Sequence, residues 1–239
     1  MSLLFIHEDR EYLLSPGETL ETDLGVLEVP EDVVSGDTVE THLGTEFTAR
    51  KLRGPDLFHH LERTGAPMMP RDVGLILGHT GIESGDRVLD AGTGSGVLAA
   101  ALGRVDAQVL SYEIDEEFAD VARENMRLAG VDSVEVRTGD VTDHLADLSG
   151  FDVVTLDTED APAVVAETPD LLVRGGFVAV YSPFVEHTRK VVEAAREAGL
   201  EDIRTLETIQ RHMDFDDRGS RPSTAGVGHT GYLTFARRP

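Results

Sequence analysis

The chain has 239 residues, with 45 Asp and Glu against 21 Lys and Arg, a formal charge of −24 and no cysteine. The lack of cysteine excludes disulfides, thiolate metal sites and a cysteine nucleophile. No apolar run approaches the ~20 residues of a membrane span, and the short acidic N-terminus is unlike a signal peptide. We therefore expect a soluble, cytoplasmic protein with one large domain and a small addition.

Lysine is scarce in this chain, and Lys51 and Lys190 are its two lysines. An acidic surface with arginine in place of lysine indicates a halophilic host, where molar salt shortens the Debye length to ~3 Å and like charges repel weakly. An acidic protein that simply avoids nucleic acid has a similar charge. The charge therefore leaves the partner open.

Residues 1–54 are predicted to form a small β domain, because short apolar runs alternate with turn signals such as Ser15-Pro16-Gly17. The runs are Leu3–Ile6, Tyr12–Leu14, Leu24–Val29 and Val33–Val34. The pair Gly54-Pro55 marks the expected domain boundary.

Residues 55–69 are expected to be a linker that contains a short helix at Asp56–Arg63. Pro70 then precedes an apolar-periodic helix from Arg71 to about His79.

Beyond residue 86, strand-like runs alternate with helical runs, so residues 70–239 are predicted to form an α/β domain with a parallel sheet covered on both faces. The expected strands are Arg87–Ala91, Gln108–Glu113, Val134–Thr138, Asp152–Asp157 and Gly176–Tyr181. The expected helices are Gly96–Gly103, Glu116–Ala129, Ala163–Leu172 and Glu186–Ala198. Two last strands, Ile203–Met213 and Tyr232–Arg237, are expected to close the sheet as an antiparallel hairpin around the loop Asp214–His229.

The first of these strands ends in the glycine turn Asp90-Ala91-Gly92-Thr93-Gly94-Ser95-Gly96. Glycines there let a ligand approach the backbone and let the following helix pack on the strand. The spacing G-x-G-x-G differs from the G-x-G-x-x-G of dinucleotide sites. Asp90 disfavours a pyrophosphate and suits a cationic ammonium group, so a nucleoside that carries an amino acid fits better than a nicotinamide cofactor.

Two further acids follow the next two strands. Glu113 can accept hydrogen bonds from both ribose hydroxyls, and Asp140, followed by Val141, can accept from an adenine amino group. A single acid at a strand end is more often a helix cap. Three in succession predict S-adenosylmethionine as the cofactor, without a metal. The predicted cofactor-binding residues are Asp90, Gly92, Thr93, Gly94, Ser95, Gly96, Glu113, Asp140 and Val141.

These motifs resemble class I S-adenosylmethionine-dependent methyltransferases. Nearly the whole chain resembles the archaeal, halophile-like tRNA (adenine-N1)-methyltransferase family, through the N-terminal β domain, Gly65–Asp72 and Gly228-His229-Thr230-Gly231-Tyr232-Leu233. The resemblance implies a Rossmann-like fold with a seven-stranded mixed sheet. It also implies methylation of T-loop adenines in tRNA and a homotetramer.

Asp157, at the end of the fourth strand, is the residue that the resemblance makes catalytic, because the matching aspartate holds the exocyclic amino group of the target adenine. Such a hydrogen bond pushes electron density toward N1 and aligns its lone pair with the sulfonium methyl group. The alternative is a plain helix cap before Pro162.

The chain lacks aromatic residues at two positions where the family pattern commonly has them. No aromatic follows Asp157, and Met69 stands where an aromatic commonly stacks on the flipped adenine. Tyr181 and Tyr232 are candidates to replace that stacking, although Tyr181 suits core packing equally well. The predicted substrate-binding residues are Met69, Tyr181, His229, Tyr232 and Arg221.

An RNA substrate normally requires a basic surface, and the basic residues of this chain are scattered. The candidates are Arg50, Lys51, Arg53, Arg71, Arg211, Arg218 and Arg221. Arg50 and Arg53 equally suit a solvated face. His59, His60 and His79 lack partners at metal-ligand spacing and are predicted to be structural.

The sequence therefore predicts a tRNA adenine-N1 methyltransferase. One alternative is another class I methyltransferase that acts on protein isoaspartate or on a small molecule such as a corrin precursor. The other is a non-catalytic, RNA-binding partner subunit, against which the intact donor motif argues.

Overall fold

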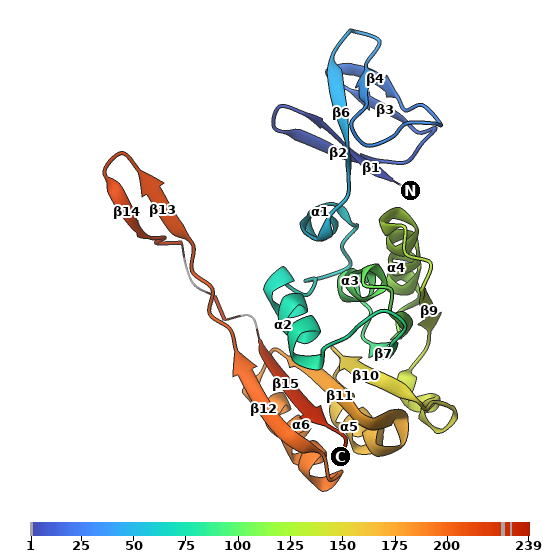
Figure 1. The fold of residues 1–239 in the computed structure, drawn as a ribbon, viewed down its shortest axis with the longest axis vertical. Coiled ribbons are helices and arrows are strands. Elements are labelled where there is room, and N and C mark those ends of the chain that lie inside the picture. The colour runs from blue at the N-terminus through green and yellow to red at the C-terminus, as the bar shows by residue number, and fades with distance from the viewer. Residues whose placement is uncertain (1, 226–227, 230) are drawn as a thin grey trace.

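The computed structural model describes residues 2–225, 228–229 and 231–239. Figure 1 shows an N-terminal β region, connected through α1 (Gly54–His60) and α2 (Pro70–Thr80) to a larger α/β body. The C-terminus lies in this body, at the other end of the molecule from the N-terminal sheets. A β-hairpin reaches out from the body on one side.

The N-terminal region contains two antiparallel sheets. A four-stranded sheet has the order β2-β1-β6-β5, and β3 pairs with β4 in a two-stranded sheet. The strands are β1 (Leu3–His7), β2 (Arg10–Leu14), β3 (Thr19–Thr22), β4 (Gly25–Glu28), β5 (Thr38–Glu40) and β6 (Glu46–Lys51). Phe5, Leu27 and Phe47 are fully buried between the sheets and give this region a core of its own.

The prediction of a strand at Val33–Val34 is wrong. These residues lie in a loop, where the Asp37 carboxylate accepts from the Val34 N–H at 2.8 Å and the Val34 residue is 60% exposed. The apolar pattern also fails to predict β3, β5 and β6, because polar residues on their exposed faces interrupt it.

The larger body is built on a seven-stranded sheet of order β12-β15-β11-β10-β7-β8-β9, which confirms the predicted Rossmann-like mixed sheet. Strands β7 to β11 run parallel to one another, whereas β15 is antiparallel to both β11 and β12. The strands are β7 (Arg87–Ala91), β8 (Gln108–Glu113), β9 (Val134–Thr138), β10 (Phe151–Leu156), β11 (Leu172–Ser182), β12 (Glu201–Glu207) and β15 (Tyr232–Arg237).

Helices cover both faces of this sheet. α2, α3 (Val97–Arg104) and α4 (Glu116–Ala129) lie on one face, and α5 (Ala161–Leu171) and α6 (Val185–Glu197) lie on the other. Successive residues of β7 face opposite sides of the sheet. Val88 packs in the core beneath α2, α3 and α4, and Leu89 packs in the core beneath α5 and α6. Two buried faces explain why adjacent residues of a central strand are both apolar, as Val88 and Leu89 are in β7.

The C-terminal strands differ from the prediction. The single strand expected at Ile203–Met213 is wrong, because β12 ends at Glu207 and a new strand, β13 (Met213–Asp216), begins beyond it. β13 pairs with β14 (Gly219–Pro222) in a hairpin that lies within the predicted loop. The expected antiparallel pairing around that loop is confirmed between β12 and β15.

No helix among the described residues combines the length and apolar character that crossing a bilayer requires.

Candidate active site

The glycine loop lies at the carboxyl edge of the sheet, where the parallel strands end together. Gly92 has a φ of +85°, and a Cβ added there would lie 2.0 Å from the main-chain oxygen of Asp157. The Asp157 N–H donates to the Ala91 carbonyl at 2.9 Å, which fixes this close approach. Gly96, with a φ of +75°, leads into α3. Only glycine fits at position 92, and there the loop touches the backbone of Asp157.

The same loop is anchored to the linker before α2. The Thr64 N–H donates to Ser95 Oγ at 3.0 Å. Asn125 of α4 is fully buried, and its Nδ2 donates to the carbonyls of Ser95 at 2.8 Å and Glu62 at 2.9 Å. Sequence reasoning missed Asn125, because its partners are far from it along the chain.

Asp90 lies beneath the glycine loop and is 3% exposed. Its Oδ2 accepts from Ser111 Oγ at 2.5 Å, its Oδ1 accepts from Thr155 Oγ1 at 2.6 Å, and Ser111 Oγ lies 2.5 Å from Thr93 Oγ1. Burial raises the pKa of Asp90, and the two hydroxyl groups oppose that rise. These side chains form a buried chain of hydrogen bonds between three strands and the loop. The predicted contact between Asp90 and an ammonium group stays a prediction.

A cleft of about 290 Å³, which we call the glycine-loop cleft, opens beside Gly92 and Gly94. Glu113 lines it and accepts from the Gly94 N–H at 2.8 Å through Oε2. Asp140 also lines it, and its Oδ1 accepts from Thr142 N–H at 2.8 Å and from Thr142 Oγ1 at 2.7 Å. These two bonds lower the pKa of Asp140 and leave its Oδ2 available to accept from a ligand.

Apolar side chains complete the glycine-loop cleft. Ile114 is 69% exposed and Phe118 is 37% exposed, while Val141 is buried. Sequence reasoning identified Val141 but missed Ile114 and Phe118. A cleft with two carboxylates and an apolar wall suits a nucleoside, whose ribose and base need both kinds of contact.

A second cleft, of about 380 Å³, shares Asp157 and Thr158 with the first. We call it the α6 cleft, because its wall comes from the end of β11 and the start of α6. Tyr181, Phe184 and Lys190 line this wall. Sequence reasoning identified Tyr181 and missed Phe184 and Lys190, whose place at a cleft depends on the turn between β11 and α6.

Asp157 therefore lies at the border of the two clefts. Solvent reaches it, yet protein atoms crowd its carboxylate, and this burial is the main reason that its pKa rises to about 7. The negative charges of Asp90 and Glu113 add to the rise. A carboxyl group that titrates near neutrality in a cleft is a candidate for function.

Tyr181 packs between the α6 cleft and the C-terminal segment, since a Cβ at Gly231 would lie 2.5 Å from its ring. Burial raises the pKa of Tyr181, with smaller contributions from Asp157 and Asp72. Asp72 is itself 4% exposed and lies 3.6 Å from Arg71 Nε. Burial raises the pKa of Asp72 as well.

His229 and Tyr232 are not among the described residues that line the two clefts, and their ring centroids are 4.9 Å apart. Their predicted contact with the substrate stays a prediction. His229 Nε2 donates to the Pro183 carbonyl at 3.0 Å, and Nδ1 lies 2.8 Å from Glu207 Oε1. These two hydrogen bonds raise the pKa of His229, the one to Pro183 most strongly. The neighbouring Thr230 of this motif lies outside the described residues.

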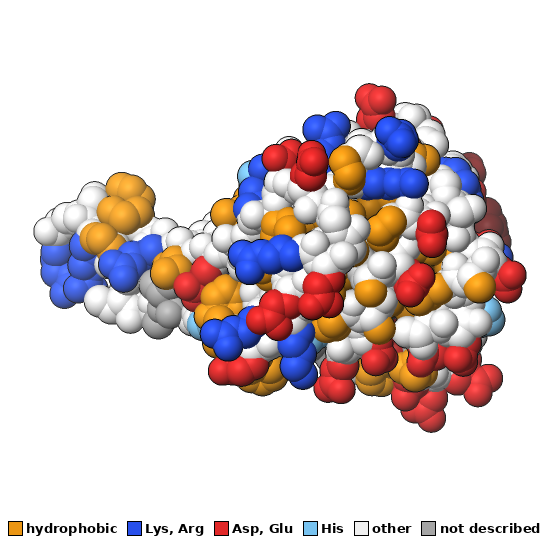
Figure 2. All heavy atoms as spheres, turned by 90° about the horizontal axis from the view of Figure 1, so that it is seen from below, with side chains coloured by type: hydrophobic (Ala, Val, Ile, Leu, Met, Phe, Trp, Pro, Cys, Tyr) orange, Lys and Arg blue, Asp and Glu red, His pale blue; other side chains and the backbone are white. Residues whose placement is uncertain are grey.

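Met69 and Arg221 are not among the described residues that line the two clefts. Met69 precedes the first turn of α2 and is 36% exposed. Arg221 lies on β14, and Figure 2 shows this hairpin standing away from the body. Their predicted contact with the substrate stays a prediction.

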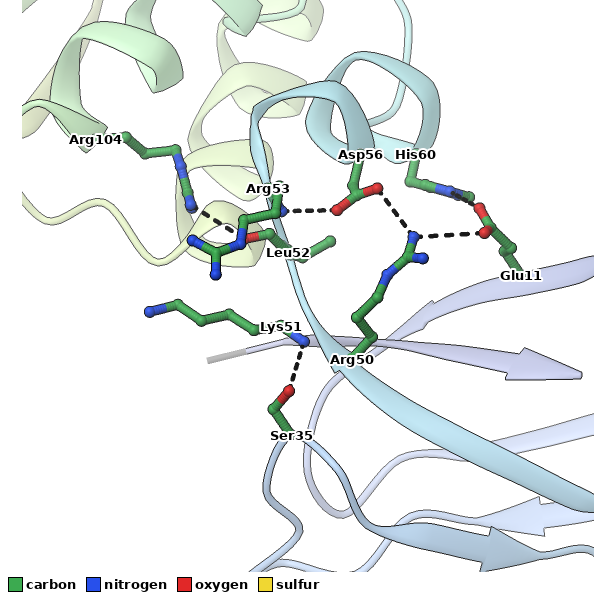
Figure 3. Close-up of polar contacts among 9 residues, drawn as sticks. All are labelled: Glu11, Ser35, Arg50, Lys51, Leu52, Arg53, Asp56, His60 and Arg104. Atoms are coloured by element: carbon green, nitrogen blue, oxygen red, sulfur yellow. Dashed lines mark hydrogen bonds and ion pairs between the residues drawn. The ribbon is translucent and has the colours of Figure 1, made fainter.

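The basic residues near the end of β6 have different surroundings (Figure 3). Arg50 forms ion pairs with Asp56 at 3.1 Å and Glu11 at 3.5 Å, and Glu11 also binds His60 at 2.9 Å. The charge of Arg50 is therefore offset by its acidic neighbours.

Lys51 and Arg53 extend to the other side, toward Arg104 of α3 (Figure 3). Arg104 donates to the Leu52 carbonyl at 3.1 Å. Within the described part of the chain, no carboxylate is paired with the side chain of Lys51, Arg53 or Arg104. These three residues form a cationic cluster at the junction of the two regions.

The histidines near the linker have protein partners. His59 packs edge-on to Phe58, and His79 accepts from Arg204 at 3.2 Å and packs on Phe235. Across residues 2–225, 228–229 and 231–239, no three His, Asp or Glu side chains gather in a way that suits a metal ion.

Comparison with known proteins gives a consistent result. Residues 57–219 match the family model described as tRNA methyltransferase complex GCD14 subunit. The chain is 33% identical to tRNA (adenine(57)-N(1)/adenine(58)-N(1))-methyltransferase TrmI of Methanocaldococcus jannaschii, over 99% of this chain and 94% of the relative.

Two solved structures share the fold. A SAM-dependent O-methyltransferase from Thermotoga maritima has a TM-score of 0.81 and 26% identity, over 99% of this chain and 92% of that one. The tRNA (m1A58) methyltransferase TrmI from Aquifex aeolicus has a TM-score of 0.76 and 23% identity, over 100% and 97% of the two chains.

Proposed function

The chain belongs to the family of the tRNA methyltransferase complex GCD14 subunit, and we propose that it transfers the methyl group of S-adenosylmethionine to N1 of an adenine in the T loop of tRNA. It is then an S-adenosylmethionine-dependent tRNA (adenine-N1)-methyltransferase. The match with the archaeal relative over nearly the whole of both chains supports this assignment.

The glycine-loop cleft fits the donor. Glu113 and Asp140 offer carboxylate oxygens for the ribose hydroxyls and the adenine amino group, and Ile114 and Phe118 offer an apolar wall for the base. Gly92 and Gly94 let the donor approach the backbone. When bound, S-adenosylmethionine would supply a methyl group on a positively charged sulfur. The N1 lone pair of the acceptor would bond to that methyl carbon as its bond to sulfur breaks, and the sulfur would leave as a neutral thioether.

Asp157 carries the proposal, because it borders both clefts. From there its ionised carboxylate accepts a hydrogen bond from the exocyclic amino group of an adenine in the α6 cleft. That bond turns N1 toward the glycine-loop cleft and stabilises the positive charge that the base acquires on methylation. The reaction requires no covalent bond to the protein, so Asp157 acts by position and charge.

RNA binding is proposed for the cationic cluster of Lys51, Arg53 and Arg104. In a chain of net charge −24 these side chains have no paired carboxylate among the described residues, whereas Arg50 beside them is neutralised. They are therefore suited to phosphate groups of a bound RNA. Molar salt would weaken this contribution, so shape and base contacts must supply most of the recognition.

A homo-oligomer, a tetramer by family resemblance, is also proposed. The β13–β14 hairpin projects from the body with basic and hydrophobic side chains on its surface (Figure 2). On the hairpin, Met213 is 50% exposed and Phe215 is 77% exposed, and Ile209, which precedes the hairpin, is 67% exposed. Large apolar residues on a projecting element are typical of a protein–protein contact.

The test is methylation of an unmodified tRNA transcript with labelled donor in molar potassium chloride, followed by nucleoside analysis. We expect 1-methyladenosine, and we expect Asp157→Ala to lose most of it while still binding the donor. Donor binding without RNA methylation would instead favour a methyltransferase for protein or small molecules. Binding of tRNA without donor binding would favour a non-catalytic partner subunit.

A further inference from the structure

The lip of the α6 cleft carries an exposed aromatic residue. Phe184 is 69% exposed and lines this cleft together with Asp157. Single exposed apolar residues are common on protein surfaces, and what distinguishes Phe184 is that it borders a cleft that also contains Asp157. An aromatic face beside a polar cleft suits a planar ligand.

The backbone that carries Phe184 is held from two sides. His229 donates to the carbonyl of Pro183 at 3.0 Å, while His187 Nδ1 accepts from Ser182 Oγ at 3.0 Å and its Nε2 donates to the Glu159 carbonyl at 3.2 Å. The Phe184 carbonyl in turn accepts from Thr188 in the first turn of α6. The ring is therefore exposed on a fixed support.

Three residues of this region face the same cleft at helical spacing. Phe184, His187 and Lys190 are three residues apart and all line it. An aromatic face and an ammonium group in one cleft match a nucleotide, which has a flat base and an anionic phosphate.

We propose that Phe184 is the surface on which the target adenine stacks after it leaves its place in the tRNA, with Lys190 facing the phosphate of the same nucleotide. This inference rests on the proposed function. It explains how a chain with Met69 and no aromatic after Asp157 can still hold a flipped base. Tyr181 is less suited to that role, because its ring packs against Gly231.

The role of Asp157 follows from the same arrangement. A base on Phe184 lies in the cleft that Asp157 borders, so one residue supports its face and the other accepts from its edge. Stacking tolerates any base, whereas the edge contact distinguishes an amino group from a carbonyl group. Affinity and selectivity then reside in different residues.

The test compares tRNA that carries the adenine methylated by the wild-type chain with the same tRNA made abasic at that position. Stacking on an aromatic contributes roughly 5- to 150-fold in affinity per base. We expect Phe184→Ala to weaken binding of the adenine tRNA by that factor and to leave binding of the abasic tRNA unchanged. Phe184→Trp should retain tight binding, and donor affinity should stay constant in all variants.

The matched control is Val185→Ala, since Val185 is 55% exposed on the same turn but is not among the residues that line the cleft. It should change neither affinity. An equal loss for adenine and abasic tRNA, or no loss for either, would overturn the stacking role. Failure of the proposed function would give a different result, because the wild-type chain would then form no 1-methyladenosine in any tRNA.

Discussion

Asp157 combines two properties that seldom occur together in a carboxylate, which are access from two clefts and a pKa raised to about 7. Only the ionised form is a pure hydrogen-bond acceptor, so in our proposal part of the protein lacks the active form at neutral pH. A positively charged donor in the adjoining cleft would favour ionisation and prepare Asp157 for the acceptor.

We predict that kcat/KM for tRNA, measured with the donor well below saturation, rises with pH through about 7 and then levels off, because loss of the Asp157 proton creates the active form. Saturating donor should move this rise to lower pH. Asp157→Asn should reduce the rate by roughly 100- to 10,000-fold and remove this rise. Initial rates from pH 5.5 to 8.5 at constant salt measure both effects. A flat wild-type profile would contradict the assignment.

At this scale the sequence predicted part of the site. Glu113, Asp140 and Asp157 do line a cleft. Parallel strands all end at the carboxyl edge of the sheet, so an acid at the end of any of them lies at that edge. The burial of Asp90 was not predictable, since Ser111 and Thr155, which occupy its oxygens, come from other strands. Phe184 carries no motif, and only the folded turn after β11 reveals its exposure.

At the scale of elements, the glycine loop contacts the backbone of Asp157 at position 92, and Asp157 borders both clefts. Strands β7, β8 and β9 and helix α4 have the bounds predicted from periodicity. The reason is that helix packing and sheet pairing bury the same apolar residues that produce the periodicity. The β13–β14 hairpin was missed because its strands pair only with each other and bury little.

We expect Gly92→Ala to abolish methylation by 100-fold or more, since the added Cβ would lie 2.0 Å from the Asp157 oxygen and push that residue out of position. Gly85→Ala is the matched control, because its φ of +91° is also positive, no described atom lies within 4 Å of its added Cβ, and it is not among the described residues that line the two clefts. Single-turnover rates and donor affinity separate the two variants. Equal effects at both positions would argue against the contact as the cause.

Asn125 is expected to stabilise the loop and the linker together. Asn125→Ala leaves the Ser95 carbonyl without this donor in a buried place, at a cost of about 1–3 kcal/mol. It also removes the donor to the Glu62 carbonyl, which is only partly buried. Thermal unfolding should show a lower Tm, and calorimetry should show weaker donor binding. Arg127→Ala, an exposed change on the same helix, should leave both nearly unaltered.

At the scale of the whole molecule, assembly depends in our proposal on the projecting hairpin. Phe215→Asp should lower the mass measured by light scattering, because Phe215 is 77% exposed there. Val34→Asp makes the same change at a 60% exposed site in the N-terminal region and should leave the mass unchanged. An oligomer that survives Phe215→Asp would place the contact elsewhere.

The charge of −24 predicts a stability that increases with salt. Screening shortens the Debye length from about 10 Å at 0.1 M to about 3 Å at 1 M and so reduces repulsion among the surface carboxylates. A gain of about 2–3 kcal/mol would raise Tm by roughly 5–10 °C for a chain of this size. Unfolding scans in 0.1, 1 and 3 M potassium chloride measure it, and a constant Tm would refute a halophilic adaptation.

The presence of Lys190 in the α6 cleft has a practical consequence for chemical labelling. The chain has two lysines, so Lys51→Arg leaves Lys190 as its single side-chain amine. The α-amino group, with a pKa of about 7.7–8.0, can be blocked first near neutral pH. RNA that occupies the α6 cleft should then protect Lys190 from an amine-reactive reagent added at higher pH, so the labelling rate reports occupancy of the cleft.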